Sequence, residues 1–372
     1  MFPTINRESS MLGFGCMRFP TTPDDKIDES EAIRMIRHAI DNGVRYIDTA
    51  YPYHGGESEI VIGKALKDGY REKVILTTKL PVWLVKTHED MMKFLDEQLK
   101  KLDTPYVDFY ILHAMNNERM DAMQKLDYKR FYAEAIAQGK VRYPGFSFHD
   151  DAKAFLRILH DWDQWGMCQV QMNILDDENQ ATLEGIREAG RRGVGVVVME
   201  PLRGGLLANP PVDVKAVYDA YAVRRSPVEW GFRYLYAMPE VITILSGMST
   251  WAQVTDNLRI FDMAKRPTLT DEELALYQKV KATYLARTKT RCTGCKYCQP
   301  CPMGVQIPRI FQGYDAAMLR ADSSFKAGYA QIQADHADAS QCIHCRKCER
   351  VCPQHLPITR FLEEIHAAST AE

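Results

Sequence analysis

The 372-residue sequence carries little excess charge of either sign: 47 Lys and Arg residues face 49 Asp and Glu residues, a formal net charge of −2. So balanced a chain lacks the strongly basic surface with which proteins bind nucleic acids or anionic membranes. It has no apolar run long enough to span a bilayer, and Met1–Ser10 lacks the charged and apolar regions of a secretory signal. We therefore expect a cytoplasmic protein with no nucleic-acid or membrane partner.

The sequence also lacks a G-x-G-x-x-G motif near its N-terminus, which disfavours the alternative of a doubly wound dinucleotide-binding sheet. Residues 12–284 instead alternate short apolar runs with longer amphipathic stretches, and Gly43, Gly139 and Gly193 follow three of these stretches as helix-ending glycines do. Eight such strands and about eight helices predict a (β/α)8 barrel, the TIM barrel. The expected strands are Leu12–Arg18, Arg45–Asp48, Val74–Lys79, Val107–His113, Val141–Phe148, Cys168–Met172, Val194–Glu200 and Val241–Ser246. The expected helices include Glu29–Asp41, Glu57–Leu66, His88–Lys101, Tyr128–Gln138, Ala152–His160, Thr182–Arg192, Val228–Ala237 and Thr270–Ala286.

Cysteine is distributed unevenly, because eight of the ten cysteines lie between Cys292 and Cys352. They form two blocks, Cys292-x2-Cys295-x2-Cys298-x2-Cys301-Pro302 and Cys342-x2-Cys345-x2-Cys348-x3-Cys352-Pro353. Three thiolates at this spacing can face one metal cluster from a single loop, and in two-cluster ferredoxins the following Cys-Pro cysteine ligates the other cluster. The spacing therefore predicts two [4Fe-4S] clusters. The first would be held by Cys292, Cys295, Cys298 and Cys352, and the second by Cys342, Cys345, Cys348 and Cys301.

Zinc and disulfide bonds are the alternative uses of these cysteines. Zinc sites commonly use C-x2-C pairs, whereas these are triplets followed by Cys-Pro. Disulfides are disfavoured by the tight local grouping and by the absence of a secretory signal. The first block has two residues instead of three before Cys301, which affects the expected loop geometry and leaves the ligand set unchanged. Cys16 and Cys168 lie outside both blocks and are expected to pack inertly in the barrel.

The two blocks belong to an internal repeat. Pro302, Val305, Ile307 and Arg309 follow Cys301 at the same offsets at which Pro353, Leu356, Ile358 and Arg360 follow Cys352. Such a repeat is expected if two half-domains, each a loop and a helix, fold around one cluster each. The basic linker Arg287–Arg291 precedes the first block. We therefore predict a barrel domain over residues 1–286 and a small, mainly α-helical, ferredoxin-like domain over residues 287–372.

Polar side chains stand at the ends of successive predicted strands. Asp48 ends the second strand, with Tyr53 in the loop after it; Lys79 ends the third and His113 the fourth. Each of them alone is more simply read as a turn cap, a loop aromatic or a solvated strand end. The active sites of TIM barrels lie at the C-terminal ends of the strands, so the joint arrangement of the four residues predicts a catalytic site.

These motifs resemble the aldo-keto reductase family. The resemblance rests on Gly43–Ala50 (GVRYIDTA) with Tyr53 and Glu57–Glu59, on Gly139–Ser147 (GKVRYPGFS) and on Glu200–Gly205 (EPLRGG). It covers residues 12 to about 262. The branch of the family with a C-terminal ferredoxin-like domain is similar over nearly the whole chain.

The resemblance implies a catalytic tetrad of Asp48, Tyr53, Lys79 and His113. Tyr53 would donate the proton that a carbonyl needs when it accepts hydride, and Lys79 would lower the pKa of this phenol from its ordinary value near ~10. Asp48 would hold the ammonium group of Lys79, and His113 would orient the carbonyl.

The resemblance also implies a nicotinamide nucleotide, NAD(H) or NADP(H). The residues that correspond to its contacts are Met17, Ser147, Gln169, Leu202, Ser246, Gly247, Ser249, Asp256 and Asn257. Three departures stand out. Phe148 replaces the usual asparagine beside the serine, and Met199 replaces the aromatic residue that stacks on the nicotinamide. Gly247, Ser249 and Gln253 stand where basic residues grip a 2′-phosphate, so anchors for that phosphate are not evident. A loop that feeds a helix N-terminus suits a phosphate, and a mere turn and helix cap is the alternative reading of the Ser246–Ser249 loop.

We therefore predict a cytoplasmic oxidoreductase that acts on a small carbonyl or alcohol substrate and relays single electrons through its clusters, with a ferredoxin or flavodoxin as the partner. Arg18, Trp83 and Met115–Asn117 are expected to rim the substrate pocket. Two alternatives stay open: a reductase whose clusters are purely structural, and a redox-sensing regulatory protein without turnover, which the complete tetrad disfavours.

Overall fold

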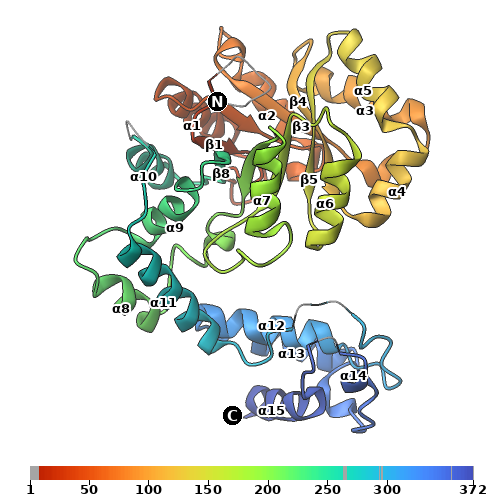
Figure 1. Ribbon diagram of the computed structural model, residues 1–372, viewed down its shortest axis with the longest axis vertical. Helices are drawn as coiled ribbons and strands as arrows, with labels where there is room; N and C mark the ends of the chain where they lie inside the picture. Colours follow the sequence, from red (N-terminus) through yellow and green to blue (C-terminus); the bar gives the residue numbers. More distant parts are fainter. Residues whose placement is uncertain (1–7, 263–265, 293, 295, 353, 372) are drawn as a thin grey trace. The chain divides into compact units, whose positions relative to one another are not determined.

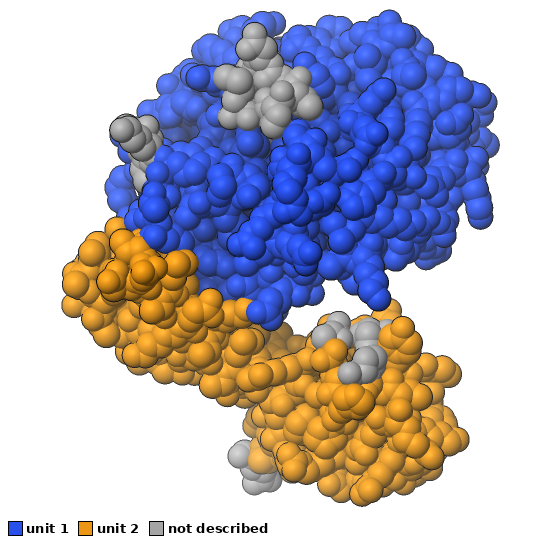
Figure 2. Space-filling model, viewed as in Figure 1, with its two compact units in different colours: residues 1–204, 228–269 blue, residues 205–227, 270–372 orange. Residues whose placement is uncertain are grey.

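The computed structural model describes residues 8–262, 266–292, 294, 296–352 and 354–371. The chain forms two compact units, residues 1–204 with 228–269 and residues 205–227 with 270–372 (Figure 2). The predicted division into a barrel domain that ends at residue 286 and a second domain that follows it stays a prediction.

The first unit is built on eight parallel strands that close into a barrel in chain order, so the predicted (β/α)8 fold is confirmed (Figure 1). The barrel closes where Leu12 pairs with Ile244 and Phe14 with Ser246. The strands are β1 (Leu12–Gly15), β2 (Tyr46–Asp48), β3 (Ile75–Leu80), β4 (Val107–Met115), β5 (Val141–Phe148), β6 (Met167–Gln171), β7 (Gly195–Met199) and β8 (Val241–Ser246).

Helices surround the barrel and lie close to the predicted positions. They are α1 (Glu29–Asp41), α2 (Ser58–Ala65), α3 (His88–Lys101), α4 (Asn117–Lys125), α5 (Tyr128–Ala137), α6 (Ala152–Asp161), α7 (Thr182–Arg191), α9 (Pro227–Tyr236) and α10 (Trp251–Phe261). Short 3-10 turns add η1 (Tyr53–Gly56), η2 (Arg71–Lys73), η3 (Val82–Leu84) and η4 (Arg203–Gly205). Helix α4 was not predicted; the side chain of Asn116 caps it by accepting a hydrogen bond from the Arg119 amide at 2.8 Å.

A layer of inward-pointing side chains fills the barrel and determines where the site lies. This layer consists of Tyr46, Ile75, Phe109, Ile111, Met167, Val197 and Leu245. Side chains alternate along a strand, so the next inward position lies two residues further on. On this rule Asp48 follows Tyr46, His113 follows Ile111 and Gln169 follows Met167. These three predicted site residues therefore belong to the layer directly above the apolar one.

The second unit is helical in the part of the chain that the structure describes, as predicted. Its longer helices are α8 (Val212–Asp219), α11 (Asp271–Arg287), α12 (Ile307–Arg320), α13 (Ser324–Ala334) and α15 (Ile358–Thr370), with the short η5 (Ala339–Gln341) and α14 (Lys347–Arg350) (Figure 1). Helices α12 and α15 begin at Ile307 and Ile358, at equal distances from Cys301 and Cys352. Both bury apolar side chains in one core, which Ile310, Phe311 and Leu362 share. The sequence repeat is therefore also a structural repeat. Among all the described helices, none is both long and apolar enough to cross a membrane.

Candidate functional site

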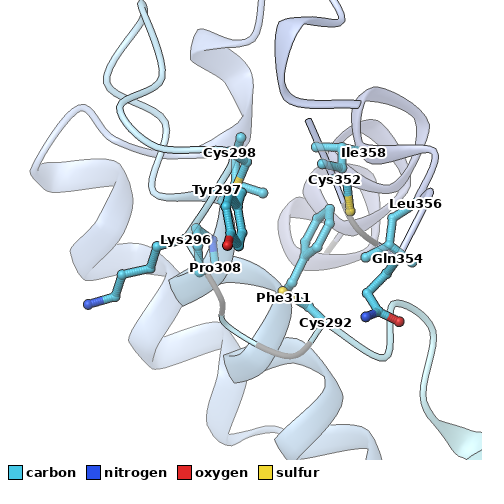
Figure 3. Close-up of a pocket in the computed structure, with 11 residues that line it drawn as sticks. Cys292, Lys296, Tyr297, Cys298, Pro308, Phe311, Cys352, Gln354, Leu356 and Ile358 are labelled. Atoms are coloured by element: carbon cyan, nitrogen blue, oxygen red, sulfur yellow. The ribbon is translucent and has the colours of Figure 1, made fainter. Parts of the chain in front are cut away.

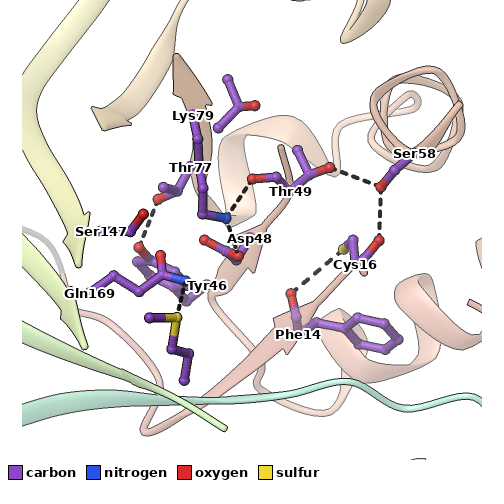
Figure 4. Close-up of polar contacts among 12 residues, drawn as sticks. Phe14, Cys16, Tyr46, Asp48, Thr49, Ser58, Thr77, Lys79, Ser147 and Gln169 are labelled. Atoms are coloured by element: carbon purple, nitrogen blue, oxygen red, sulfur yellow. Dashed lines mark hydrogen bonds and ion pairs between the residues drawn. The ribbon is translucent and has the colours of Figure 1, made fainter. Parts of the chain in front are cut away.

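A buried ion pair lies at the C-terminal ends of β2 and β3. Lys79 Nζ donates hydrogen bonds to Asp48 Oδ1 at 2.6 Å and to the carbonyl oxygen of Thr49 at 2.7 Å (Figure 4). Burial raises the pKa of Asp48, and Lys79 opposes this rise. Burial lowers the pKa of Lys79, but the charges of Asp48 and Tyr53 and the hydrogen bonds to both raise it above its ordinary value. Lys79 is thus held as an ammonium ion in a site without solvent.

Tyr53 begins η1, just beyond β2. The ammonium nitrogen of Lys79 lies 4.9 Å from the centre of the Tyr53 ring. Burial raises the pKa of Tyr53 above its ordinary value. Lys79 acts in the opposite direction but does not bring the pKa below that value, so the lowered pKa expected from the sequence is not found in this structure. The loop is fastened by His54, which has a left-handed backbone (φ 50°) and accepts a hydrogen bond from the Phe19 amide at 3.1 Å. Tyr53 is therefore positioned by η1 instead of by a strand.

His113 completes the predicted group from β4. Its ring centre lies 6.0 Å from that of Tyr53 and 5.0 Å from that of Trp83. Burial, followed by the cationic neighbour Lys79, lowers the pKa of His113 to about 2, so the imidazole is neutral at physiological pH. Its Nδ1 atom is buried and makes no hydrogen bond to any residue the structure describes. A neutral ring of this kind can accept or donate a hydrogen bond to a ligand.

A second buried hydrogen-bond network holds β3 in place, and the sequence did not indicate this role. Glu59 Oε1 accepts hydrogen bonds from Thr78 Oγ1 and Gln98 Nε2, both at 2.6 Å. Gln98 also donates to the carbonyl oxygen of Lys79 at 3.1 Å, and Tyr110 donates to Gln98 at 2.7 Å. The network therefore fixes the backbone that carries Lys79. Glu59 belongs to the Glu57–Glu59 motif of the family resemblance, but the sequence did not indicate that it is hydrogen-bonded to this strand.

Two of the predicted nicotinamide contacts stand on neighbouring strands. Ser147 on β5 and Gln169 on β6 are direct partners in the sheet, and both are buried. Ser147 Oγ accepts a hydrogen bond from the Ala114 amide at 2.7 Å, which leaves its hydroxyl proton for another partner. Gln169 Nε2 donates to Met199 Sδ at 3.8 Å, and its Oε1 is buried without a hydrogen-bond partner among the described residues (Figure 4).

The loop after β8 carries the next predicted contacts. Asn257 on α10 donates a hydrogen bond to Ser246 Oγ at 2.9 Å, which joins the helix to the strand end. Gln253 Oε1 accepts hydrogen bonds from the amides of Ser249 and Thr250 at 2.7 and 3.2 Å. The N-terminus of α10 is therefore capped by Gln253, a residue of the same helix. Asp256 instead pairs with Arg259 on the same helix, at 2.9 Å.

Three residues around the first and seventh strands complete the mouth of the barrel. Met17 is largely exposed after β1. Leu202 lies against Gly231, where an added Cβ would come within 2.7 Å of its Cδ2 atom. The side chain of Arg18 runs past Gly247, 3.4 Å from where a Cβ would stand, and its guanidinium lies 3.9 Å from the corresponding position at Gly204. Arg18 had been expected at the substrate rim, but the structure places it between two loops of the predicted nucleotide site.

The first set of cluster cysteines lines one hollow in the second unit. Cys292 and Cys298 reach it from the first block and Cys352 from the second (Figure 3). The hollow is walled by Ile307, Phe311 and Ile358, which are buried. Cys295 lies outside the described residues. The structure thus gathers cysteines from opposite ends of the cysteine-rich segment around one hollow, and the crossed ligand sets stay a prediction.

The second set lines another hollow. Cys301 from the first block meets Cys342, Cys345 and Cys348 from the second. Burial raises the pKa of the Cys348 thiol to about 11 and also raises that of Cys342. Among the described residues, no three His, Cys, Asp or Glu side chains come close enough together to hold a single metal ion.

Asp315 on α12 supports the chain that leads into the first hollow, and nothing in the sequence pointed to it. Its carboxylate accepts hydrogen bonds from the amides of Lys289, Thr290 and Arg291 at 2.7–3.2 Å and from the Thr290 hydroxyl at 2.7 Å. The amide of Cys292 in turn donates to Thr290 Oγ1 at 3.2 Å. One buried carboxylate therefore fixes the approach to the first cysteine.

Known protein families match both the barrel and the cysteine-rich segment of the chain. The model of the aldo/keto reductase family matches residues 11–282, and that of the 4Fe-4S dicluster domain matches residues 291–356. An aldo-keto reductase of Glycine max is 27% identical over 55% of this chain, and the matched part is 59% of that relative's length. Aldo-keto reductase YhdN of Bacillus subtilis is 38% identical over 28% of this chain and 34% of its own. Among solved structures, the holo form of aldo-keto reductase AKR11C1 from Bacillus halodurans aligns with a TM-score of 0.62 and 27% identity, over 75% of this chain and 95% of that one.

Proposed function

The chain belongs to the aldo/keto reductase family and carries a 4Fe-4S dicluster domain, and on this premise we propose that it is an NAD(P)-dependent carbonyl/alcohol oxidoreductase coupled to one-electron transfer. The observation that carries the proposal is the buried Asp48–Lys79 pair beside Tyr53, with the neutral ring of His113 facing the same phenol. Thiolate-bound clusters suit the reducing cytoplasm, where we expect the enzyme to act.

Tyr53 is the proposed proton donor. When hydride reaches a carbonyl carbon, negative charge develops on the oxygen and a proton must be delivered to it. The phenol of Tyr53 is a weak acid in this buried site, and the charge of Lys79 stabilises the phenolate that remains after transfer. Asp48 keeps Lys79 charged and in place. In the oxidation direction the same phenolate removes the proton from an alcohol.

His113 is the proposed orienting group. Because its pKa is about 2, it does not compete with Tyr53 as an acid near neutral pH. Its unpartnered Nδ1 atom and its place across from the Tyr53 ring support a hydrogen bond to the substrate oxygen. Trp83, which packs against His113, would form one wall for the substrate.

The residues expected around the nicotinamide fit such a group. The unpartnered Oε1 of Gln169 can accept a hydrogen bond from the carboxamide nitrogen, and the hydroxyl of Ser147 can donate one to the carboxamide oxygen. When bound, the nicotinamide supplies or accepts the hydride. Met199, beside Gln169, offers an apolar, polarisable face to the ring.

The pyrophosphate is proposed to lie near Arg18, Gly204 and Gly247. The guanidinium of Arg18 makes no ion pair with any described residue, and the side chain lies against both glycine positions. The side chain of Gln253 already binds the amides of Ser249 and Thr250, which precede α10, so Arg18 supplies the positive charge beside this loop. Ser246 and Asn257, together with Met17, Leu202, Ser249 and Asp256, would line the rest of the nucleotide.

The proposed cluster ligands are the two crossed sets. Cysteines that line a common hollow suit a polynuclear cluster, since each thiolate then binds a different iron atom. Cys292, Cys295, Cys298 and Cys352 would hold the first cluster, and Cys342, Cys345, Cys348 and Cys301 the second. When bound, the clusters supply one-electron steps, and an electron carrier such as a ferredoxin or flavodoxin would be the partner.

The proposal is tested on protein purified without oxygen. We expect about eight iron and eight sulfide per chain, and oxidation of NADH or NADPH when a panel of small carbonyl compounds is offered. The matched pair is Tyr53→Phe against Tyr51→Phe, since Tyr51 lies nearby but contacts Phe94 and Glu97. Equal turnover in both variants would contradict the role of Tyr53. Stoichiometric zinc without iron would contradict the clusters.

A further inference from the structure

The rim of the second cysteine hollow exposes apolar side chains that a folded domain normally covers. Ile343, Val351 and Met303 all line this hollow and are 60%, 51% and 42% exposed. Cys345 is itself exposed. Buried walls are common to both hollows, since Ile307 lines both of them, and the 67% exposed Tyr297 lines both as well. The second hollow is distinguished by the exposed apolar side chains on its rim and by the exposed Cys345.

The same rim is positively charged. Arg346 and Lys347 line the hollow, and Arg350 lies on the same short segment with its guanidinium directed at the carbonyl oxygen of Cys345 at 3.5 Å. The segment 343–351 contains these three cations and a single carboxylate, Glu349, in a chain whose net charge is −2. Glu349 accepts hydrogen bonds from the amide and hydroxyl of Thr359 at 2.9 and 2.7 Å and pairs with Arg346 at 4.0 Å, so it offsets one of the three cations and leaves the segment with a net positive charge.

An apolar centre inside a charged rim is the arrangement of a transient protein interface, in which charge steers the encounter and apolar contact completes it. We propose that this face, made of Met303, Ile343, Arg346, Lys347, Arg350 and Val351, docks an acidic one-electron carrier protein at the second cluster site. The inference rests on the proposed function, which it deepens by naming the entry point and the chemistry of the partner. A second copy of the chain fits less well, because a twofold contact would oppose the same cations.

The step at this face is a single electron transfer. With a cluster bound, one electron would pass from the reduced carrier to the cluster that Cys301, Cys342, Cys345 and Cys348 would hold; no covalent bond would form or break, and no proton would be required. Tyr297, Cys298 and Ile307 line both hollows, so the two proposed cluster sites are neighbours within this unit. An electron that enters at the second site would therefore have a short distance to travel to the first.

The test uses the full-length protein with its clusters assembled and an acidic plant-type ferredoxin as the probe. We expect the dissociation constant, measured by calorimetry, to rise steeply with salt, because the rim is screened. Lys347→Glu and Arg350→Glu should each weaken binding by roughly tenfold or more and slow the reduction of the protein by the reduced ferredoxin. Ile343→Ser should weaken binding without changing its salt dependence.

The matched control is Lys326→Glu on α13, an exposed lysine that lines neither hollow. It should leave both the affinity and its salt dependence as in the wild type. Iron content and the electron paramagnetic resonance spectrum after dithionite must stay unchanged in every variant, and Lys347→Gln serves if the charge reversal disturbs assembly. Binding that is insensitive to salt or equally weakened by Lys326→Glu would overturn the docking face, as would self-association or vesicle binding through this face in place of the ferredoxin.

The outcome separates this inference from the proposed function. If dithionite reduces the clusters and the barrel turns over carbonyl substrates but no acidic carrier binds, the docking face is refuted and the oxidoreductase stands. If dithionite does not reduce the clusters, the electron-transfer half of the proposed function fails first.

Discussion

Variants of the buried Asp48–Lys79 pair allow its contribution to stability to be measured separately from its contribution to catalysis. Lys79 Nζ lies 2.6 Å from Asp48 Oδ1, and both side chains are almost completely buried. Removing one partner of such a pair leaves an uncompensated charge and typically costs about 3–5 kcal/mol, whereas replacing both partners with apolar groups of similar volume is often neutral. We therefore expect Lys79→Met alone to lower the free energy of unfolding by about 3–5 kcal/mol. The double variant Asp48→Leu/Lys79→Met should recover most of that loss.

The catalytic readout should not recover. Both the single and the double variants lack the ammonium group beside Tyr53, and a general acid–base system that loses its activating charge falls by about a hundredfold or more in turnover. The assay combines urea denaturation of the cluster-loaded protein, followed by circular dichroism, with NAD(P)H oxidation on the same samples. If the losses of stability in Asp48→Leu and Lys79→Met simply add in the double variant, the pair is not coupled as the geometry indicates. Activity that returns along with stability would refute the role of Lys79 in proton transfer.

Three further predictions follow from other parts of the molecule. Burial keeps the pKa of His113 at about 2 in the folded barrel, whereas the unfolded chain protonates this ring below about pH 6.5, so the free energy of unfolding falls as the pH falls. In His113→Asn, the decrease in this free energy between pH 7.5 and 5.5 should be smaller than in the wild type by roughly 1.4 kcal/mol, measured by urea denaturation. An unchanged pH profile would contradict the buried neutral ring. Asp315→Ala should remove the anchor ahead of Cys292 and reduce the iron content toward about four per chain, while Asp322→Ala, an exposed carboxylate bonded only to local groups, should not; equal iron in both would refute the anchoring role. Arg18→Ala should raise the dissociation constant of NAD(H) or NADP(H) about tenfold, as expected when a charged hydrogen bond to a phosphate is lost. Equilibrium fluorescence titration measures this constant. An unchanged dissociation constant together with a raised KM for the carbonyl would show that Arg18 contacts the substrate instead of the nucleotide.

Much of the fold could be predicted because its determinants are local. The alternation of apolar and amphipathic stretches located the eight strands within a few residues, since a buried parallel strand needs a continuous apolar run. Helix α4 was missed because it is short and polar and is fixed mainly by the Asn116 cap. The repeat after Cys301 and Cys352 predicted equivalent helices correctly, because the same residue types at the same offsets begin both.

The residue types of the site were also determined by the sequence, whereas their environment was decided by the tertiary structure. Barrel closure places Asp48, His113 and Gln169 in one inward layer, and burial there makes His113 neutral and leaves Gln169 Oε1 without a partner among the described residues. The cysteine spacing indicated the ligand sets, but only the packing of α12 and α15 against one core shows which apolar side chains around the two hollows are buried and which stay exposed. Asp315 could not be found in the sequence, because it acts on backbone amides about 25 residues away. Contacts between distant segments set burial, and burial sets both charge state and accessibility.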